Sequence, residues 1–104
     1  MEQDLSRNVM LRKPTVQEIQ ALIADRNGWV IDKNRLVKEY QFADFARAIV
    51  FVNKLVNPIE ERQNYPRILV TYNRVYVSLF TNEVGGITLL DFDMAKDFDL
   101  LAGR

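Results

Sequence analysis

The chain has 104 residues, with 14 Lys and Arg against 14 Asp and Glu, and it contains neither histidine nor cysteine. This length predicts one domain, and the zero net charge argues against nucleic acid and anionic membrane as main partners, because both require a clustered positive field. The missing residue types exclude disulfides, ordinary zinc sites and histidine-dependent nucleophilic mechanisms, so acid–base chemistry would have to use carboxylates, lysine or tyrosine.

The N-terminal region is polar. No apolar run approaches the ~20 residues that cross a bilayer, and the acidic start does not resemble a secretory signal, so a cytoplasmic location is expected. Residues 1–13 lack a clear hydrophobic period and are interpreted as an N-terminal arm. Residues 14–104 are then the folded domain.

The first predicted helix begins at a capping box. Thr15 and Glu18 have the N-cap and N3 spacing, and apolar residues follow at helical intervals. Gly28 is expected to end this helix as a left-handed C′ residue.

Two strands are predicted next, at residues 29–31 and 35–42, joined by turn residues at 32–34. The alternation of the second strand is imperfect, because Lys38 falls among its apolar positions. Residues 44–63 then have a wide apolar stripe at helical spacing. Pro58 lies late in this helix and is expected to kink it or to separate its last turn, because proline has no backbone donor.

Residues 67–72 and 75–81 are predicted as a hairpin around a two-residue loop at Asn73 and Arg74. This loop pairs Tyr72 with Val75 and places six side chains on one face: Ile68, Val70, Tyr72, Val75, Val77 and Leu79. The opposite face then holds Leu69, Thr71, Tyr76, Ser78 and Phe80.

The last helix is expected to start at Thr88, with Asp91 at N3 and a buried stripe of Leu90, Met94, Phe98 and Leu101. Four aspartates make this helix acidic: Asp91, Asp93, Asp97 and Asp99. The order of elements favours an α+β fold, a four-stranded antiparallel sheet with three helices packed on one face. Small domains of this kind often cover their free sheet edges and faces by pairing with a second copy.

Several segments together suggest a family. Residues 40–48, 81–83 and 86–91 carry motifs, and a spaced set of residues accompanies them: Glu60, Asn64, Tyr65, Pro66, Tyr72, Asn82 and Asp91. In these features, and in Trp29 after Gly28, residues 15–102 resemble the pterin-4a-carbinolamine dehydratase family, also called dimerisation cofactor. The family pattern is an acidic residue, three spacers, His-His-Pro, then Tyr, His and Asp.

The resemblance also implies a change in chemistry. The family dehydrates a 4a-hydroxytetrahydropterin with three histidines, and Asn64, Tyr65 and Asn82 stand in their places. Asparagine does not titrate near neutrality and tyrosine titrates near pH ~10, while losing a positioned acid or base typically costs ~10²–10⁴ in rate. We therefore expect a degenerate site with no catalytic residue, metal or cofactor, in which the two asparagines could still bind a planar heterocycle. Structural roles are favoured for Asp91, as a helix-start carboxylate, and for Glu60, as a solvated residue.

The hairpin face away from the helices offers partner-binding candidates: Leu69, Arg74, Tyr76 and Phe80. Aromatic side chains with polar neighbours are typical of recognition surfaces, although a self-association could equally bury this face.

The histidine-lacking branch of the family resembles the Rubisco assembly factor of α-carboxysomes. This resemblance implies a non-catalytic chaperone that binds the Rubisco large subunit as a homodimer, in the cytoplasm or with carboxysomes. Two alternatives remain: residual dehydration through Glu60, Tyr65 and Asp91, and a transcription-factor dimerisation cofactor.

Overall fold

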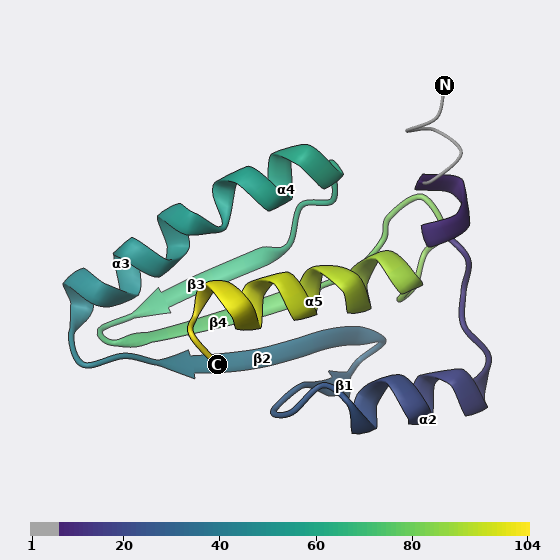
Figure 1. The fold of residues 1–104 in the computed structure, drawn as a ribbon, viewed down its shortest axis with the longest axis horizontal. Helices are drawn as coiled ribbons and strands as arrows, with labels where there is room; N and C mark the ends of the chain where they lie inside the picture. The colour runs from purple at the N-terminus through teal and green to yellow at the C-terminus, as the bar shows by residue number, and fades with distance from the viewer. Residues whose placement is uncertain (1–6) are drawn as a thin grey trace.

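The computed structural model describes residues 7–104 and has a four-stranded antiparallel sheet with helices over one face (Figure 1). The strands are β1 (Val30–Asp32), β2 (Arg35–Gln41), β3 (Arg67–Thr71) and β4 (Arg74–Leu79), in the order β1-β2-β4-β3. The helices are α2 (Val16–Ala24), α3 (Phe45–Lys54), α4 (Val56–Arg62) and α5 (Leu89–Leu101), and residues 7–10 form a further helical turn. The expected α+β class is confirmed.

The hydrophobic core lies between the sheet and the helices. The two central strands, β2 and β4, present alternate apolar residues to it, and α5 lies across this face of the sheet (Figure 1). Its fully or almost fully buried members include Leu36, Tyr40, Phe51, Val75, Val77, Leu79, Leu90, Met94 and Phe98. The expected stripe of α5 is confirmed, with Leu101 partly buried at its end.

Lys38 has a structural reason to lie among apolar positions. Its ammonium is 2.8 Å from Oδ1 of Asp99 on α5, and the same carboxylate accepts from the Tyr40 hydroxyl at 2.6 Å and from the Trp29 indole at 3.1 Å. The pKa of Tyr40 is raised, first by burial and then by its hydrogen bond to Asp99. The network therefore fixes β2 to the last helix with all polar groups paired.

Pro58 divides the long helix more deeply than expected. α3 ends at Lys54, with Leu55 as its C-cap, and Pro58 lies in the first turn of α4, which is a helix of 7 residues. Because proline has no N–H, the carbonyl of Lys54 has no donor four residues later, and the chain turns at Leu55. The described residues therefore contain four helices where the sequence predicted three.

The prediction that Gly28 is the C′ residue of the first helix is wrong. The helix ends at Ala24, and Asp25 is its C-cap. The N–H of Asp25 donates to the Leu22 carbonyl at 3.2 Å, and the N–H of Arg26 donates to the Ile23 carbonyl at 3.1 Å. These bonds tighten the last turn before Gly28 is reached. Gly28 does have a positive φ, of 84°, in the turn that leads into the first strand.

The predicted hairpin register is also wrong. Thr71 pairs with Arg74, so the loop is Tyr72 and Asn73. Asn73 is held there by two hydrogen bonds with Phe42. Its side-chain amide donates to the Phe42 carbonyl at 2.8 Å, and its backbone carbonyl accepts from the Phe42 N–H at 2.8 Å. Each cross-strand partner shifts by two residues, an even number, so the faces remain as predicted. Tyr72 alone leaves its predicted face and lies exposed in the loop.

The described part of the expected arm contacts the domain. The N–H of Leu89 at the start of α5 donates to the Arg12 carbonyl at 3.3 Å, and the Lys13 side chain lies beside Gly86. Residues 1–6 of the arm lie outside the described part of the chain.

Candidate functional site

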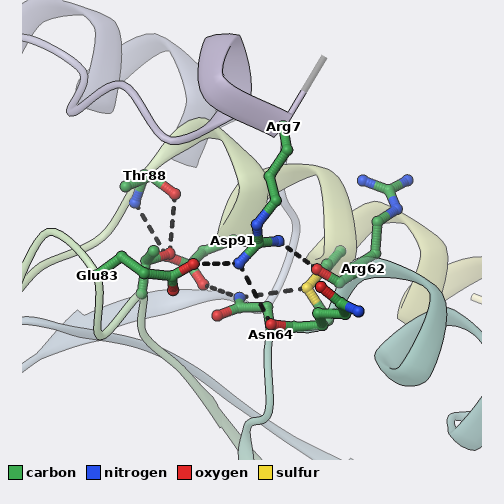
Figure 2. A network of polar contacts seen from close by, with 9 residues as sticks. Arg7, Arg62, Asn64, Glu83, Thr88 and Asp91 are labelled. Carbon is green, nitrogen blue, oxygen red and sulfur yellow. Dashed lines mark hydrogen bonds and ion pairs between the residues drawn. The ribbon is translucent and has the colours of Figure 1, made fainter. Parts of the chain in front are cut away.

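A buried polar network surrounds the start of α5. The carboxylate of Asp91 accepts from the Thr88 N–H at 2.9 Å and from the Thr81 hydroxyl at 2.7 Å, both at Oδ2. Its other oxygen accepts from the side-chain amide of Asn64 at 2.8 Å (Figure 2). The expected capping box at Thr88 and Asp91 is therefore confirmed, and it is wholly buried.

Three separate segments bring these residues together. Asn64 lies between α4 and β3, directly after Gln63, which adopts the left-handed conformation with φ 53°. Thr81 follows β4 and forms an antiparallel bridge with Gly86. The loop that this bridge closes leads directly into α5, so Thr81 meets Asp91 across a tight turn.

The carboxylate of Asp91 has no exposed oxygen to offer. Burial raises its pKa, against the lowering effect of the hydrogen bonds from Thr88, Thr81 and Asn64. The group is 0% exposed, and each of its oxygens is held by a fixed neutral donor. The arrangement is suited to stabilising a helix start, and a ligand could bind the carboxylate only by displacing one of these donors.

Arg7 lies over the same region, as Figure 2 shows. Its guanidinium donates to the carbonyls of Arg62 and Gln63 at the end of α4, the latter at 3.3 Å, and forms an ion pair with Glu83. A cation is favourable at a helix C-terminus, where the last carbonyls lack partners. The sequence analysis missed this residue, because the arm shows no periodic pattern that could have signalled the contact.

The other predicted site residues do not join Asp91. Tyr65 is exposed and donates its hydroxyl to Glu60 at 2.9 Å, and this hydrogen bond is the main cause that raises the tyrosine pKa. Pro66 precedes β3, whereas Tyr72 follows the far end of that strand. Asn82 lies exposed in the loop after Thr81. The predicted set is therefore divided into two bonded pairs, Asn64 with Asp91 and Tyr65 with Glu60, with Tyr72 at the opposite end of the hairpin.

The open face of the sheet contains a groove of about 610 Å³. Its lining residues are Asp32, Lys33, Asn34, Arg35, Val37, Arg67, Tyr76, Ser78, Phe80 and Asn82. The guanidinium carbon of Arg35 is 5.0 Å from the centroid of the Phe80 ring, and its Nη2 donates to the Ser78 carbonyl at 3.1 Å. Two predicted partner-binding residues, Tyr76 and Phe80, thus line one concave surface.

The other two partner-binding candidates flank this groove. Leu69 is directly opposite Tyr76 in the β3–β4 register, and its side chain is 61% exposed. Arg74 lies farther along β4 and forms an ion pair with Glu39 at 2.8 Å. All four candidates therefore share the face that the helices leave uncovered.

Residues 7–104 contain neither a metal-binding cluster nor a membrane-spanning helix. This part of the chain holds no group of three His, Cys, Asp or Glu placed to bind a metal ion. Among its helices, none combines the length and the apolar character that a bilayer crossing requires.

The sheet order, the helical cover and the polar set before β3 and after β4 define a pterin dehydratase-like protein. Residues 12–101 match the family described as pterin 4 alpha carbinolamine dehydratase. The chain belongs to this family. The match begins at residue 12, so it does not include Arg7.

Similar proteins agree with this membership. A protein of Picosynechococcus sp., named as a pterin-4-alpha-carbinolamine dehydratase with the assignment unproven, is 41% identical over 92 residues, which are 88% of this chain and 100% of the relative. A protein of Trichormus variabilis with the same name is 44% identical over 78 residues, which are 75% of this chain and 84% of the relative.

Two solved structures have the same fold. A transcriptional coactivator/pterin dehydratase from Brucella melitensis has a TM-score of 0.84 and 28% identity, covering 88% of this chain and 100% of its own. A pterin dehydratase-like protein identified as a RuBisCO assembly factor in the alpha-carboxysome has a TM-score of 0.63 and 25% identity, covering 75% of this chain and 93% of its own.

Proposed function

We propose that this chain is a non-catalytic member of its family and acts as an assembly factor for Rubisco, associated with α-carboxysomes. It binds the large subunit as a homodimer through the open face of the sheet. The likeness to the solved assembly factor is the observation that supports the partner. The state of the candidate site supports the absence of catalysis.

The chemistry of the site favours a binding role over dehydration. Elimination of water from a hydroxypterin requires an acid for the leaving hydroxyl and a base for the ring nitrogen. Asn64 cannot supply either near neutral pH, and it blocks Asp91 by bonding to it. Glu60 is on the surface with Tyr65 bound to it. No titratable pair is therefore aimed at a common substrate position within the predicted set.

The first test is enzymatic. The purified chain, mixed with a 4a-hydroxytetrahydropterin, is expected to give the dehydration rate of buffer alone. A family member that retains its three histidines provides the positive control. A rate within about tenfold of that control would overturn the proposal, because losing a single acid or base already costs ~10²–10⁴.

The second test is assembly. Co-expression of this chain with the large and small Rubisco subunits is expected to raise the yield of assembled enzyme, measured by native gel electrophoresis and carboxylase activity. The control is co-expression with the histidine-containing family member, which should not raise it. An unchanged yield with this chain would contradict the assembly role.

Residual dehydration is the second candidate function. The names of the relatives favour it, and burial raises the pKa of Asp91, as is common for carboxyls at catalytic sites. In this alternative Glu60 and Tyr65 complete the site. The rate measurement above separates the two candidates, because only the second gives turnover that is lost in Asp91→Asn.

A further inference from the structure

The groove on the open face carries an excess of positive charge. Lys33, Arg35 and Arg67 line it, and Asp32 is the one carboxylate in its lining. Among residues 7–104, neither Lys33 nor Arg67 takes part in an ion pair, and Arg35 bonds only to Ser78 and lies over Phe80. Arg35 donates to the Ser78 carbonyl at 3.1 Å, and Arg67 is the cross-strand partner of Ser78, so both cations lie beside the same residue of β4. The pKa of Arg35 is lowered first by burial and then by the charge of Arg67, while the charge of Asp91 raises it.

The rest of the face is neutral, so the excess charge is local. Farther along the sheet, Arg74 is paired with Glu39 at 2.8 Å. On the helical side, Arg62 contacts both Asp93 and Asp97, and Lys38 contacts Asp99. A net charge of zero for the whole chain is therefore compatible with a groove that is lined by three cations and one carboxylate.

Apolar side chains border these cations on both sides. Val30 on the edge strand β1 is directly opposite Val37, and Leu69 on the other edge strand is directly opposite Tyr76. Val37 and Tyr76 line the groove, so their cross-strand neighbours project to the same face. Val30 and Leu69 are 56% and 61% exposed. A ligand lying across the sheet would thus meet two apolar flanks and a cationic centre.

We propose that this groove binds an acidic, extended polypeptide segment of a partner protein, with its carboxylates on Lys33 and Arg67 and an apolar side chain against Leu69. Charge complementarity favours this occupant, because three cations and a single carboxylate line the groove. The inference rests on the proposed function only for the identity of that partner, a Rubisco subunit.

Two other occupants fit the observations less well. Single-stranded nucleic acid uses exposed aromatic rings for stacking, but the Phe80 ring is already covered by Arg35 and Tyr76 is only half-exposed. A second copy that paired through this same face would place the cations of two grooves opposite one another, because a two-fold interface uses the same patch on both subunits.

Binding can be measured with a defined probe. A short fluorescein-labelled peptide of glutamates with one leucine is titrated with the full chain at low salt, and fluorescence anisotropy gives its affinity. Its counterpart with lysine in place of glutamate and a labelled oligothymidylate are measured in parallel. We expect saturable binding of the acidic peptide, with amide shift changes in NMR spectra at Val37, Tyr76 and Ser78.

Matched variants test the position of the site. Arg67→Glu should weaken acidic-peptide binding by about tenfold or more, because the reversed charge repels the ligand. Arg67→Lys should largely retain binding, because lysine keeps the positive charge. Lys54→Glu makes the same change on the exposed end of α3, on the helical side, and should leave the affinity unchanged. NMR spectra of each variant check that it is folded.

Four results would overturn the inference: no saturable binding of the acidic peptide, an equal loss in Lys54→Glu, tighter binding of the oligothymidylate, or a change of oligomeric state in Arg67→Glu. The Rubisco co-expression assay is scored separately. Acidic-peptide binding without any gain in Rubisco yield would refute the proposed function and leave the groove assignment supported.

Discussion

At the first turn of α5, a buried carboxylate is held by neutral donors alone. The Thr81 hydroxyl donates to Asp91, so the short contact of 2.9 Å between the Thr81 and Thr88 hydroxyls must use the proton of Thr88. Asn64 supplies the third donor from another segment. The hydrogen bonds therefore run in one direction, from Thr88 to Thr81 to Asp91, as expected of a structural network.

Removing one donor from this network should be costly. Thr81→Val keeps the shape of the side chain but deprives Asp91 of a hydrogen bond and leaves the Thr88 hydroxyl without its acceptor. We expect the free energy of unfolding to fall by about 1–3 kcal/mol, the usual cost of buried unsatisfied polar groups. Urea unfolding followed by circular dichroism measures it.

The control for this prediction is Thr71→Val, the same change at an exposed strand position. It should alter the free energy of unfolding by no more than about 0.5 kcal/mol. Equal effects of the two substitutions would show that the network around Asp91 contributes nothing specific to stability.

The capping box of α2 predicts a dependence of stability on pH. The pKa of Glu18 is lowered from 4.5 to about 2, first by the hydrogen bond from Arg12 and then by the Thr15 N–H. Between these two values the unfolded chain binds more protons than the folded chain, so this contribution is complete above about pH 4.5 and is lost as the pH falls toward about 2.

Glu18→Gln should therefore flatten the loss of thermal stability over this acid range, because an amide does not titrate there. Melting temperatures measured at a series of pH values check it. Glu61→Gln changes an exposed carboxylate on α4 and should leave the profile as in the parent chain. An unaltered profile in Glu18→Gln would contradict the role given to this capping box.

At the scale of single residues, local pattern predicted the contacts within a few residues and missed the distant ones. Both capping boxes follow from residues three apart, and the structure contains both. The contacts of Arg7 with the end of α4 join residues 55 and 56 positions apart, and nothing in the local sequence indicates them. The grouping of Arg35 with Arg67 likewise depends on the sheet order.

At the scale of elements, side-chain alternation predicted the faces of the hairpin but not its loop. Val75, Val77 and Leu79 are buried whichever two-residue loop is chosen, because the two registers differ by an even number of residues. Asn73 decides between the two registers, because it is bonded to Phe42, which directly follows β2. Similarly, Pro58 predicted a break in its helix. The break lies near Lys54, four residues before the proline, because the Lys54 carbonyl has no N–H at position 58 to bond.

The observed loop is strained at one residue. Tyr72 has φ 51° with a large exposed side chain, and it is the first of the two loop residues. A left-handed first position is typical of a type II′ turn, which favours glycine there. Tyr72→Gly is therefore expected to raise the free energy of unfolding by about 0.5–1 kcal/mol, as relief of strain exceeds the added chain entropy.

Thermal unfolding followed by circular dichroism measures this gain, and Thr71→Gly in the adjoining strand is the matched control. Thr71 is the last residue of β3, and glycine is disfavoured in strands, so that substitution should lower the melting temperature. A lower melting temperature in both variants would show that the Tyr72 side chain stabilises the loop by contacts that outweigh its strain.

At the scale of the whole molecule, the two faces of the sheet have separate roles. The helical face holds the apolar core, and polar groups that reach it, such as Lys38, are paired there. The open face combines the partner-binding candidates with a groove lined by Lys33, Arg35 and Arg67. Composition alone correctly gave a neutral chain, but it could not show that the charges are unevenly distributed, because the groove residues come from all four strands and two connecting segments.

This division predicts that partner binding and folding can be separated. The double variant Tyr76→Ala with Phe80→Ala removes two half-buried rings from the open face and leaves the opposite core intact. Because aromatic anchors dominate interfaces, we expect its affinity for the Rubisco large subunit to fall by about 2 kcal/mol or more, roughly thirtyfold. Surface plasmon resonance measures the affinity, and light scattering the oligomeric state.

The matched control removes apolar groups from the helical side. Phe45→Ala with Val50→Ala changes two residues of α3 that are each 52% exposed, and it should leave the affinity unchanged. If the Tyr76 and Phe80 variant loses both affinity and self-association, the open face is a subunit contact and the partner must bind elsewhere. A folded variant that keeps its oligomeric state but loses affinity would assign the face to the partner, because partner binding and self-association would use the same two rings.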